Sequence, residues 1–144
     1  MNQAADVVDW RYFEEARSEL GDGFLKILGY FREDGLKSIE RIEAAMRAQD
    51  TAALVIPAHT LKGESRQFGA EMLADCAEEI EMTARRCIEI GQFPDNLIPD
   101  VVKLRQLWAS TIEAFDEELS PLMKREKPGF GAGAQNTQFG RAGG

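Results

Sequence analysis

Apolar residues recur every three or four positions along most of this chain, and that spacing predicts α-helices. Five amphipathic segments are expected, over residues 10–20, 23–48, 50–69, 71–90 and 99–123. No sustained alternation of apolar and polar residues occurs, so strands are not expected. Amphipathic helices joined by short loops bury their apolar stripes most economically in an antiparallel bundle.

Aspartate, glycine and proline mark special positions in these segments. Asp9 can cap the first helix through its carboxylate, and Gly69 suits a left-handed position at the end of the third. Gly35 lies within the apolar stripe of the second segment, where we expect a neighbouring helix to approach closely. Pro57 lies inside the third segment and removes an amide donor, so a kink or a late helix start is expected there.

The composition changes near the end of the chain. From Glu126 onward the sequence is rich in glycine and poor in branched apolar residues, so it cannot bury enough surface to offset its ordering entropy. We therefore expect one helical domain over residues 1–125 and a flexible tail over residues 126–144. Two Phe-Gly pairs in that tail, at 130–131 and 139–140, are a candidate docking element.

The net charge and the absence of certain segments exclude several classes of protein. The formal net charge is −8, whereas a nucleic-acid binder needs a cationic face for phosphates. No run of apolar residues is long enough to span a membrane, and the N-terminus does not resemble a secretory signal. A cytoplasmic protein is therefore expected. One histidine and two cysteines are too few ligands for a metal site, so none is expected.

The stretch AHTLKGESRQFGA, residues 58–70, contains the only histidine, His59. On a helical wheel one face, predicted to be buried, gathers Leu54, Ala58, Leu61, Ser65 and Phe68. His59 lies opposite this face and shares an outward patch with Lys62, Gly63 and Arg66. A core histidine would lie with the apolar residues, so the wheel predicts that this imidazole is displayed to solvent.

An exposed imidazole nitrogen can act as a nucleophile, a base or a ligand. A catalytic triad would also need an orienting carboxylate and a second nucleophile, which the local spacing does not supply. A phosphoryl acceptor needs an exposed nitrogen, a nearby cation and clearance for the donor. His59, Lys62 and Gly63 offer these three features.

Residues 58–70 resemble the signature of histidine phosphotransfer (HPt) domains, in which His-x-Leu-Lys-Gly is followed by a small residue and then a Gly-Ala pair. The helix CAEEIEMTARRCIEIG, residues 76–91, is similar to the family's following helix, and residues 8–31 resemble its first two helices. The resemblance covers roughly residues 8–123. It implies an all-α fold, an antiparallel up-down four-helix bundle with a short extra N-terminal helix.

The resemblance also implies a function. His59 would accept a phosphoryl group from the aspartyl phosphate of a receiver domain, in a response regulator or a hybrid histidine kinase, and relay it to another receiver. Lys62 would steady the phosphoryl oxygens, and Gly63 would give the receiver access. The chain has no ATP-site motif, so it is expected to be a relay intermediate rather than a kinase. Mg²⁺ is expected on the receiver, and this chain, expected to be a monomer, should bind no cofactor. The alternative is a binding module that docks on and sequesters a partner without phosphorylation, using His59 only as a contact.

Further residues match the rim of the family's site. Glu81 and Arg85 lie four apart, so Glu81 either orients the imidazole through one ring nitrogen or forms only a surface ion pair with Arg85.

The remaining candidates concern the partner's surface. Arg66 is expected either to touch the partner's acidic site or to be a solvated charge, and Gln67 is a rim residue or plain polar surface. Val55 and Ile56 are expected to be exposed and to form the docking surface.

Overall fold

The computed structural model describes residues 7–126, and the side chains of residues 7–120. The expected tail, residues 126–144, lies almost entirely outside this range. The chain divides into two units at Ile112, which lies within its last helix. The helices up to Ile112 are described together, and residues 113–126 continue that last helix.

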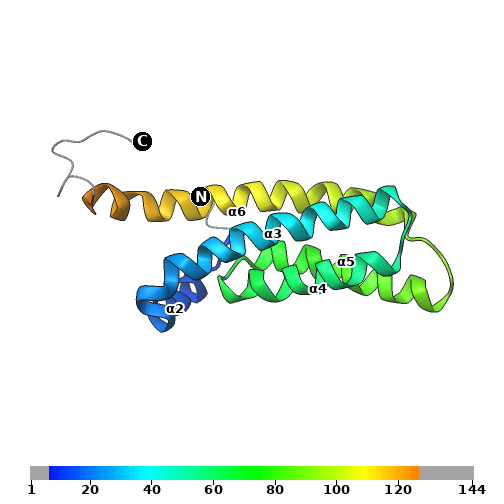
Figure 1. The fold of residues 1–144 in the computed structure, drawn as a ribbon, viewed down its shortest axis with the longest axis horizontal. Helices are drawn as coiled ribbons and strands as arrows, with labels where there is room; N and C mark the ends of the chain where they lie inside the picture. Colours follow the sequence, from blue (N-terminus) through cyan, green and yellow to red (C-terminus); the bar gives the residue numbers. More distant parts are fainter. Residues whose placement is uncertain (1–6, 127–144) are drawn as a thin grey trace. The chain divides into compact units, whose positions relative to one another are not determined.

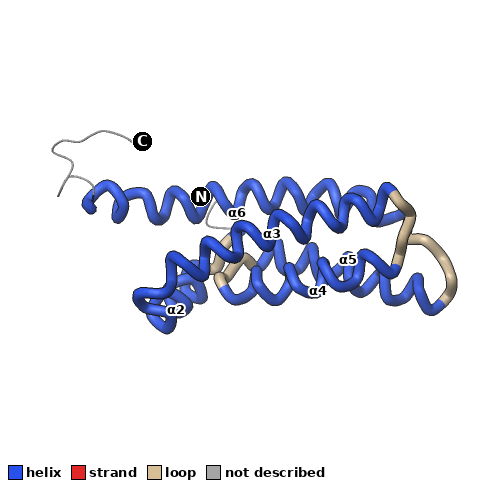
Figure 2. Tube along the Cα trace, in the orientation of Figure 1, coloured by secondary structure: helices blue, strands red, loops and turns tan. Residues whose placement is uncertain are grey.

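The regular structure of residues 7–126 is entirely helical (Figures 1 and 2). Its elements are α2 (Trp10–Leu20), η1 (Gly21–Gly23), α3 (Phe24–Arg47), α4 (Ala52–Gln67), α5 (Glu71–Glu89), η2 (Asp95–Leu97) and α6 (Ile98–Glu126). The five expected helices are confirmed, each within three residues of its predicted bounds. The bundle consists of α3, α4, α5 and the part of α6 up to Ile112, and α2 is the short extra helix. Within the described residues no helix is both long and apolar enough to cross a membrane.

Local signals fix the ends of these helices as expected. Asp9 caps α2, because its Oδ1 accepts a hydrogen bond from Arg11 N at 3.1 Å. Gly69 has a φ of 78°, the left-handed conformation predicted for the end of α4. The following amide, Ala70 N, donates to the Ser65 carbonyl at 2.9 Å, and Asp9 N donates to the Gly69 carbonyl at 2.7 Å. The segment before α2 is therefore tied to the turn between α4 and α5.

The predicted buried face of α4 is confirmed. Leu54, Ala58, Leu61, Ser65 and Phe68 are each at most 1% exposed. Phe68 lies between two aromatic residues of α3, with ring centroids 5.9 Å from Phe24 and 5.4 Å from Phe31. Phe31 in turn lies 5.3 Å from Trp108 of α6. These contacts turn the opposite side of α4 outward.

Pro57 does not delay the start of α4, and the predicted late start is wrong. The helix begins at Ala52 and continues through Pro57 to Gln67. Proline removes one amide, but the hydrogen bonds of the other residues and the burial of Pro57 itself hold the helix together. A bend of α4 at Pro57 stays a prediction.

Gly35 of α3 lies directly against the Trp108 side chain of α6. A Cβ added at Gly35 would clash with Cζ3 of Trp108 and would lie 2.6 Å from its Cη2. Overpacking of this kind costs about 1–3 kcal/mol, more than the roughly 1 kcal/mol that alanine gains over glycine in a helix. We therefore expect Gly35→Ala to lower the free energy of unfolding, measured by urea denaturation.

Gly29 provides the matched control on the same helix. A Cβ added there meets nothing within 4 Å, so Gly29→Ala should raise the free energy of unfolding by up to about 1 kcal/mol. Equal stabilities of the two variants would contradict the close contact at Gly35.

Candidate functional site

His59 is displayed on the outer side of α4. Its side chain is 58% exposed, as the wheel predicts. One turn further along the helix, a Cβ added to Gly63 would meet nothing within 4 Å. The surface beside the imidazole is therefore open to another molecule.

Glu81 of α5 is the centre of the site. Its side chain is only 4% exposed, and its Oε2 lies 3.0 Å from Nδ1 of His59. Lys62 Nζ lies 3.0 Å from the other oxygen, Oε1. Arg85 places Nε at 3.0 Å and Nη2 at 2.9 Å from Oε2. Glu81 thus contacts Nδ1 of the imidazole and also forms the i,i+4 ion pair with Arg85, so it is not only a surface ion pair. That it orients the imidazole for phosphorylation stays a prediction.

The environment of Glu81 keeps its carboxylate ionised. Burial alone would raise the pKa of Glu81, but the hydrogen bonds from Lys62, Arg85 and His59 outweigh it and hold that pKa below its usual value. An ionised carboxylate only accepts hydrogen bonds. The network therefore assigns the proton of the neutral imidazole to Nδ1.

This assignment leaves Nε2 with an available lone pair. No residue that the structure describes makes a hydrogen bond to His59 Nε2. Its lone pair faces outward from a ring whose other nitrogen is fixed. Such a nitrogen is a candidate nucleophile whose orientation is set by a buried carboxylate.

Arg66 is held against α5. Its guanidinium lies 3.0 Å from Glu71, 3.2 Å from Asp75 and 2.8 Å from Glu78. The wheel places Arg66 outward, and its side chain is 38% exposed, but its charge is engaged by three carboxylates of the same chain. Contact of Arg66 with a partner's acidic site stays a prediction. Gln67, at the end of α4, is exposed.

The structure corrects the expectation for Val55, which is only 8% exposed. Val55 lies two turns before Lys62 and on the same side of α4, the side whose charged group reaches Glu81 of α5. Packing of α5 against this side covers Val55, so it cannot form a docking surface. Ile56, in contrast, is 69% exposed, as expected.

The exposed residues of α4 around His59 form a narrow surface, which we call the outer strip. It consists of Ile56, His59, Thr60, Gly63 and Gln67. Sequence reasoning did not single out Thr60, although the wheel places it between His59 and the buried face. The residues that the structure describes include no group of three or more His, Cys, Asp or Glu side chains able to hold a metal ion.

Comparisons with known proteins point to one family. A family model described as the Hpt domain matches residues 26–120, which include all the candidate site residues. The chain is similar to the crystal structure of histidine-containing phosphotransfer protein B (HptB) from Pseudomonas aeruginosa PAO1, with 26% sequence identity and a TM-score of 0.70. This similarity covers 78% of the present chain and 95% of that chain. No curated protein sequence matches the chain.

Proposed function

The chain belongs to the Hpt domain family, the phosphotransfer proteins of phosphorelays, and we propose that its His59 accepts a phosphoryl group from the aspartyl phosphate of a receiver domain and relays it to another receiver. The observation that carries this proposal is the exposed imidazole with Nδ1 held by buried Glu81 and Nε2 free. The donors and acceptors would be receiver domains of response regulators or hybrid histidine kinases. The same proposal places the protein in the cytoplasm as a monomer. A monomer leaves its one exposed histidine accessible to two receivers in turn.

The site supports a direct displacement at phosphorus. The lone pair of His59 Nε2 attacks the phosphorus, the P–O bond to the partner's aspartate breaks, and that carboxylate leaves with the bonding electrons. The new Nε2–P bond makes the ring a cation, because Nδ1 keeps its proton. Glu81, 3.0 Å from Nδ1, stabilises that charge. Relay to the next receiver is the reverse reaction.

Lys62 is suited to a second role in this step. Its side chain is 22% exposed and its ammonium group contacts Glu81, so a flexible stem holds the charge at the edge of the site. We propose that it turns toward the phosphoryl oxygens as the group arrives. The Mg²⁺ that neutralises the donor phosphate is expected on the receiver domain, and this chain is expected to supply none.

Lys62→Ala should slow transfer more than it weakens docking. We expect kcat to fall by roughly tenfold to a hundredfold, less than the loss of a rigid oxyanion donor, because Lys62 is shared with Glu81. The value of KM for the phosphorylated receiver should change little. Lys103→Ala, at an exposed position of α6, is the control and should leave both constants unchanged. A rise in KM with unchanged kcat would assign Lys62 to docking instead.

The proposed function is tested by incubating the protein with purified, phosphorylated receiver domains of its own organism. Transfer should place on this chain a phosphate that is stable to base and labile to acid, as expected of phosphohistidine. If a receiver binds tightly but never labels the chain, the protein is instead a binding module that sequesters its partner.

A further inference from the structure

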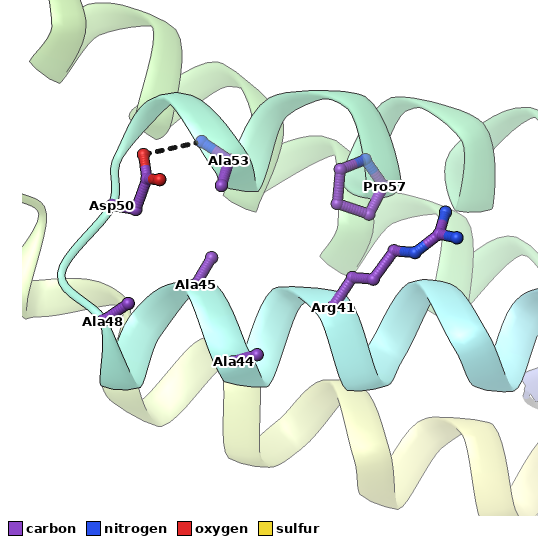
Figure 3. A pocket seen from close by; sticks show the side chains of 7 residues that line it. All are labelled: Arg41, Ala44, Ala45, Ala48, Asp50, Ala53 and Pro57. Atoms are coloured by element: carbon purple, nitrogen blue, oxygen red, sulfur yellow. Dashed lines mark hydrogen bonds between the residues drawn. The ribbon is translucent and has the colours of Figure 1, made fainter.

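A cavity of about 340 Å³ opens between the second half of α3 and the first half of α4 (Figure 3). It is lined by Arg41, Ala44, Ala45, Ala48, Asp50, Ala53 and Pro57. The alanine side chains are too short to fill the space between the two helices. Together with the proline ring they give the cavity a mostly apolar wall.

Two charged side chains flank this wall, and only one is engaged within the described chain. Asp50 Oδ1 accepts a hydrogen bond from Ala53 N at 3.2 Å at the start of α4 (Figure 3). Arg41 extends from α3 toward Pro57 (Figure 3). Among the residues that the structure describes, Arg41 has no hydrogen-bond or ion-pair partner. The cavity therefore presents an apolar wall beside an unpaired guanidinium.

The cavity borders the outer strip that displays His59. Pro57 lines the cavity, and its neighbour Ile56 belongs to the strip and is 69% exposed. Two residues turn an α-helix by about 200°, so His59 lies on the other side of α4 from Pro57, and the exposed Ile56 and Ala53 lie between them around the helix. A protein that covers His59 and extends across Ile56 to Ala53 would also meet the cavity, because Ala53 lines it.

We propose that this cavity receives an apolar side chain of the receiver domain that docks over His59, while a neighbouring Asp or Glu of that domain pairs with Arg41. This inference rests on the proposed function. The apolar wall favours an apolar occupant, and the unpaired Arg41 favours an acidic neighbour. A side chain buried in such a pocket anchors an interface, and a charge pair at its rim sets the association rate and the register. The cavity would thereby determine which receivers dock productively.

The test uses a receiver domain that labels His59 of the wild-type protein, found by trying purified receivers of the same organism. Ala44→Leu places a larger side chain at an exposed position of the cavity wall. Arg41→Glu reverses the charge at its rim. The matched controls are Ala109→Leu, exposed on α6, and Lys26→Glu, exposed on α3 about 22 Å from Arg41 along the helix.

The two cavity variants should weaken docking in different ways. Ala44→Leu should raise Kd and KM about tenfold or more through faster dissociation. Arg41→Glu should slow association, and added salt should reduce this difference from wild type. Both controls should stay within about twofold of the wild-type Kd. Phosphoramidate, a small phosphoryl donor, should label His59 equally in all four variants, which shows that the histidine is accessible, and far-UV circular dichroism equal to that of the wild type shows that the variants are folded.

Unchanged receiver binding in both cavity variants would overturn this proposal and leave the cavity to another ligand, such as a small carboxylate. Equal weakening by a variant and its control would overturn it too. Failure of every receiver to label the wild-type protein is a different result, because it contradicts the proposed function and the inference together.

Discussion

His59→Gln is expected to abolish phosphoryl transfer from a phosphorylated receiver while leaving the fold intact. An amide nitrogen has no available lone pair, so glutamine cannot take the place of Nε2 as a nucleophile. Removing the nucleophile should lower the transfer rate by at least about 10³-fold. The side chain of His59 is 58% exposed, so little packing is lost and the free energy of unfolding should change by less than about 1 kcal/mol.

The sequence makes this a demanding test, because His59 is the only histidine. No other imidazole in the chain can carry an acid-labile phosphate in the variant. Gln106→Ala, at an exposed position of α6, is the control and should still be labelled. Persistent acid-labile labelling of His59→Gln would show that another residue accepts the phosphate, and would contradict the assignment of His59 as the phosphoryl acceptor.

The features that sequence predicts well are those set within one helix. The cap at Asp9, the left-handed Gly69 and the buried face of α4 depend on residues a few positions apart, and all three are confirmed. The outward direction of His59 follows from the same arithmetic. These features need no knowledge of what packs beside the helix.

The wrong expectation for Val55 arises because a second helix decides its exposure. A wheel for α4 separates core from solvent, but it does not show that α5 also covers the side that carries Val55. The acidic partners of Arg66 lie 5 to 12 residues further along the chain, on α5, so the wheel of α4 gives no sign of them. The burial of Glu81 likewise depends on the packing of α5 against α4. The family resemblance, not the spacing, singles out Glu81.

Glu81→Gln should impair both transfer and stability, because one buried carboxylate serves the imidazole and two cations. Glutamine has a similar shape but no charge, so it no longer stabilises the ring cation or requires the proton on Nδ1. We expect kcat for transfer to fall about 10–100-fold with little change in KM. Nitrogen NMR of the imidazole should show that the Nε2–H form of His59 gains population.

The stability effect should depend on pH in a definite direction. In the folded protein, burial alone would raise the pKa of Glu81, but the hydrogen bonds from Lys62, Arg85 and His59 outweigh burial and hold that pKa below its usual value. A carboxylate with a lowered folded pKa stabilises the fold above its unfolded pKa, about 4.3, and loses that contribution as the pH falls through the folded value. Glu81→Gln should therefore lower the free energy of unfolding by about 1–3 kcal/mol at pH 7. The difference from wild type should shrink in acid, below about pH 4.

Glu43→Gln is the matched control, because it removes a carboxylate that is paired with an arginine but lies away from His59. Its hydrogen bond with Arg105 also lowers the pKa of Glu43, but the Arg105 side chain is 46% exposed, so this variant should cost at most about 1 kcal/mol. It makes no contact with His59 among the interactions described for the chain, and transfer should proceed at the wild-type rate. If Glu81→Gln matches Glu43→Gln in both transfer and stability, Glu81 does not position His59. A selective loss in Glu81→Gln, together with the change of tautomer, would show that the buried carboxylate holds the imidazole ready for phosphoryl transfer.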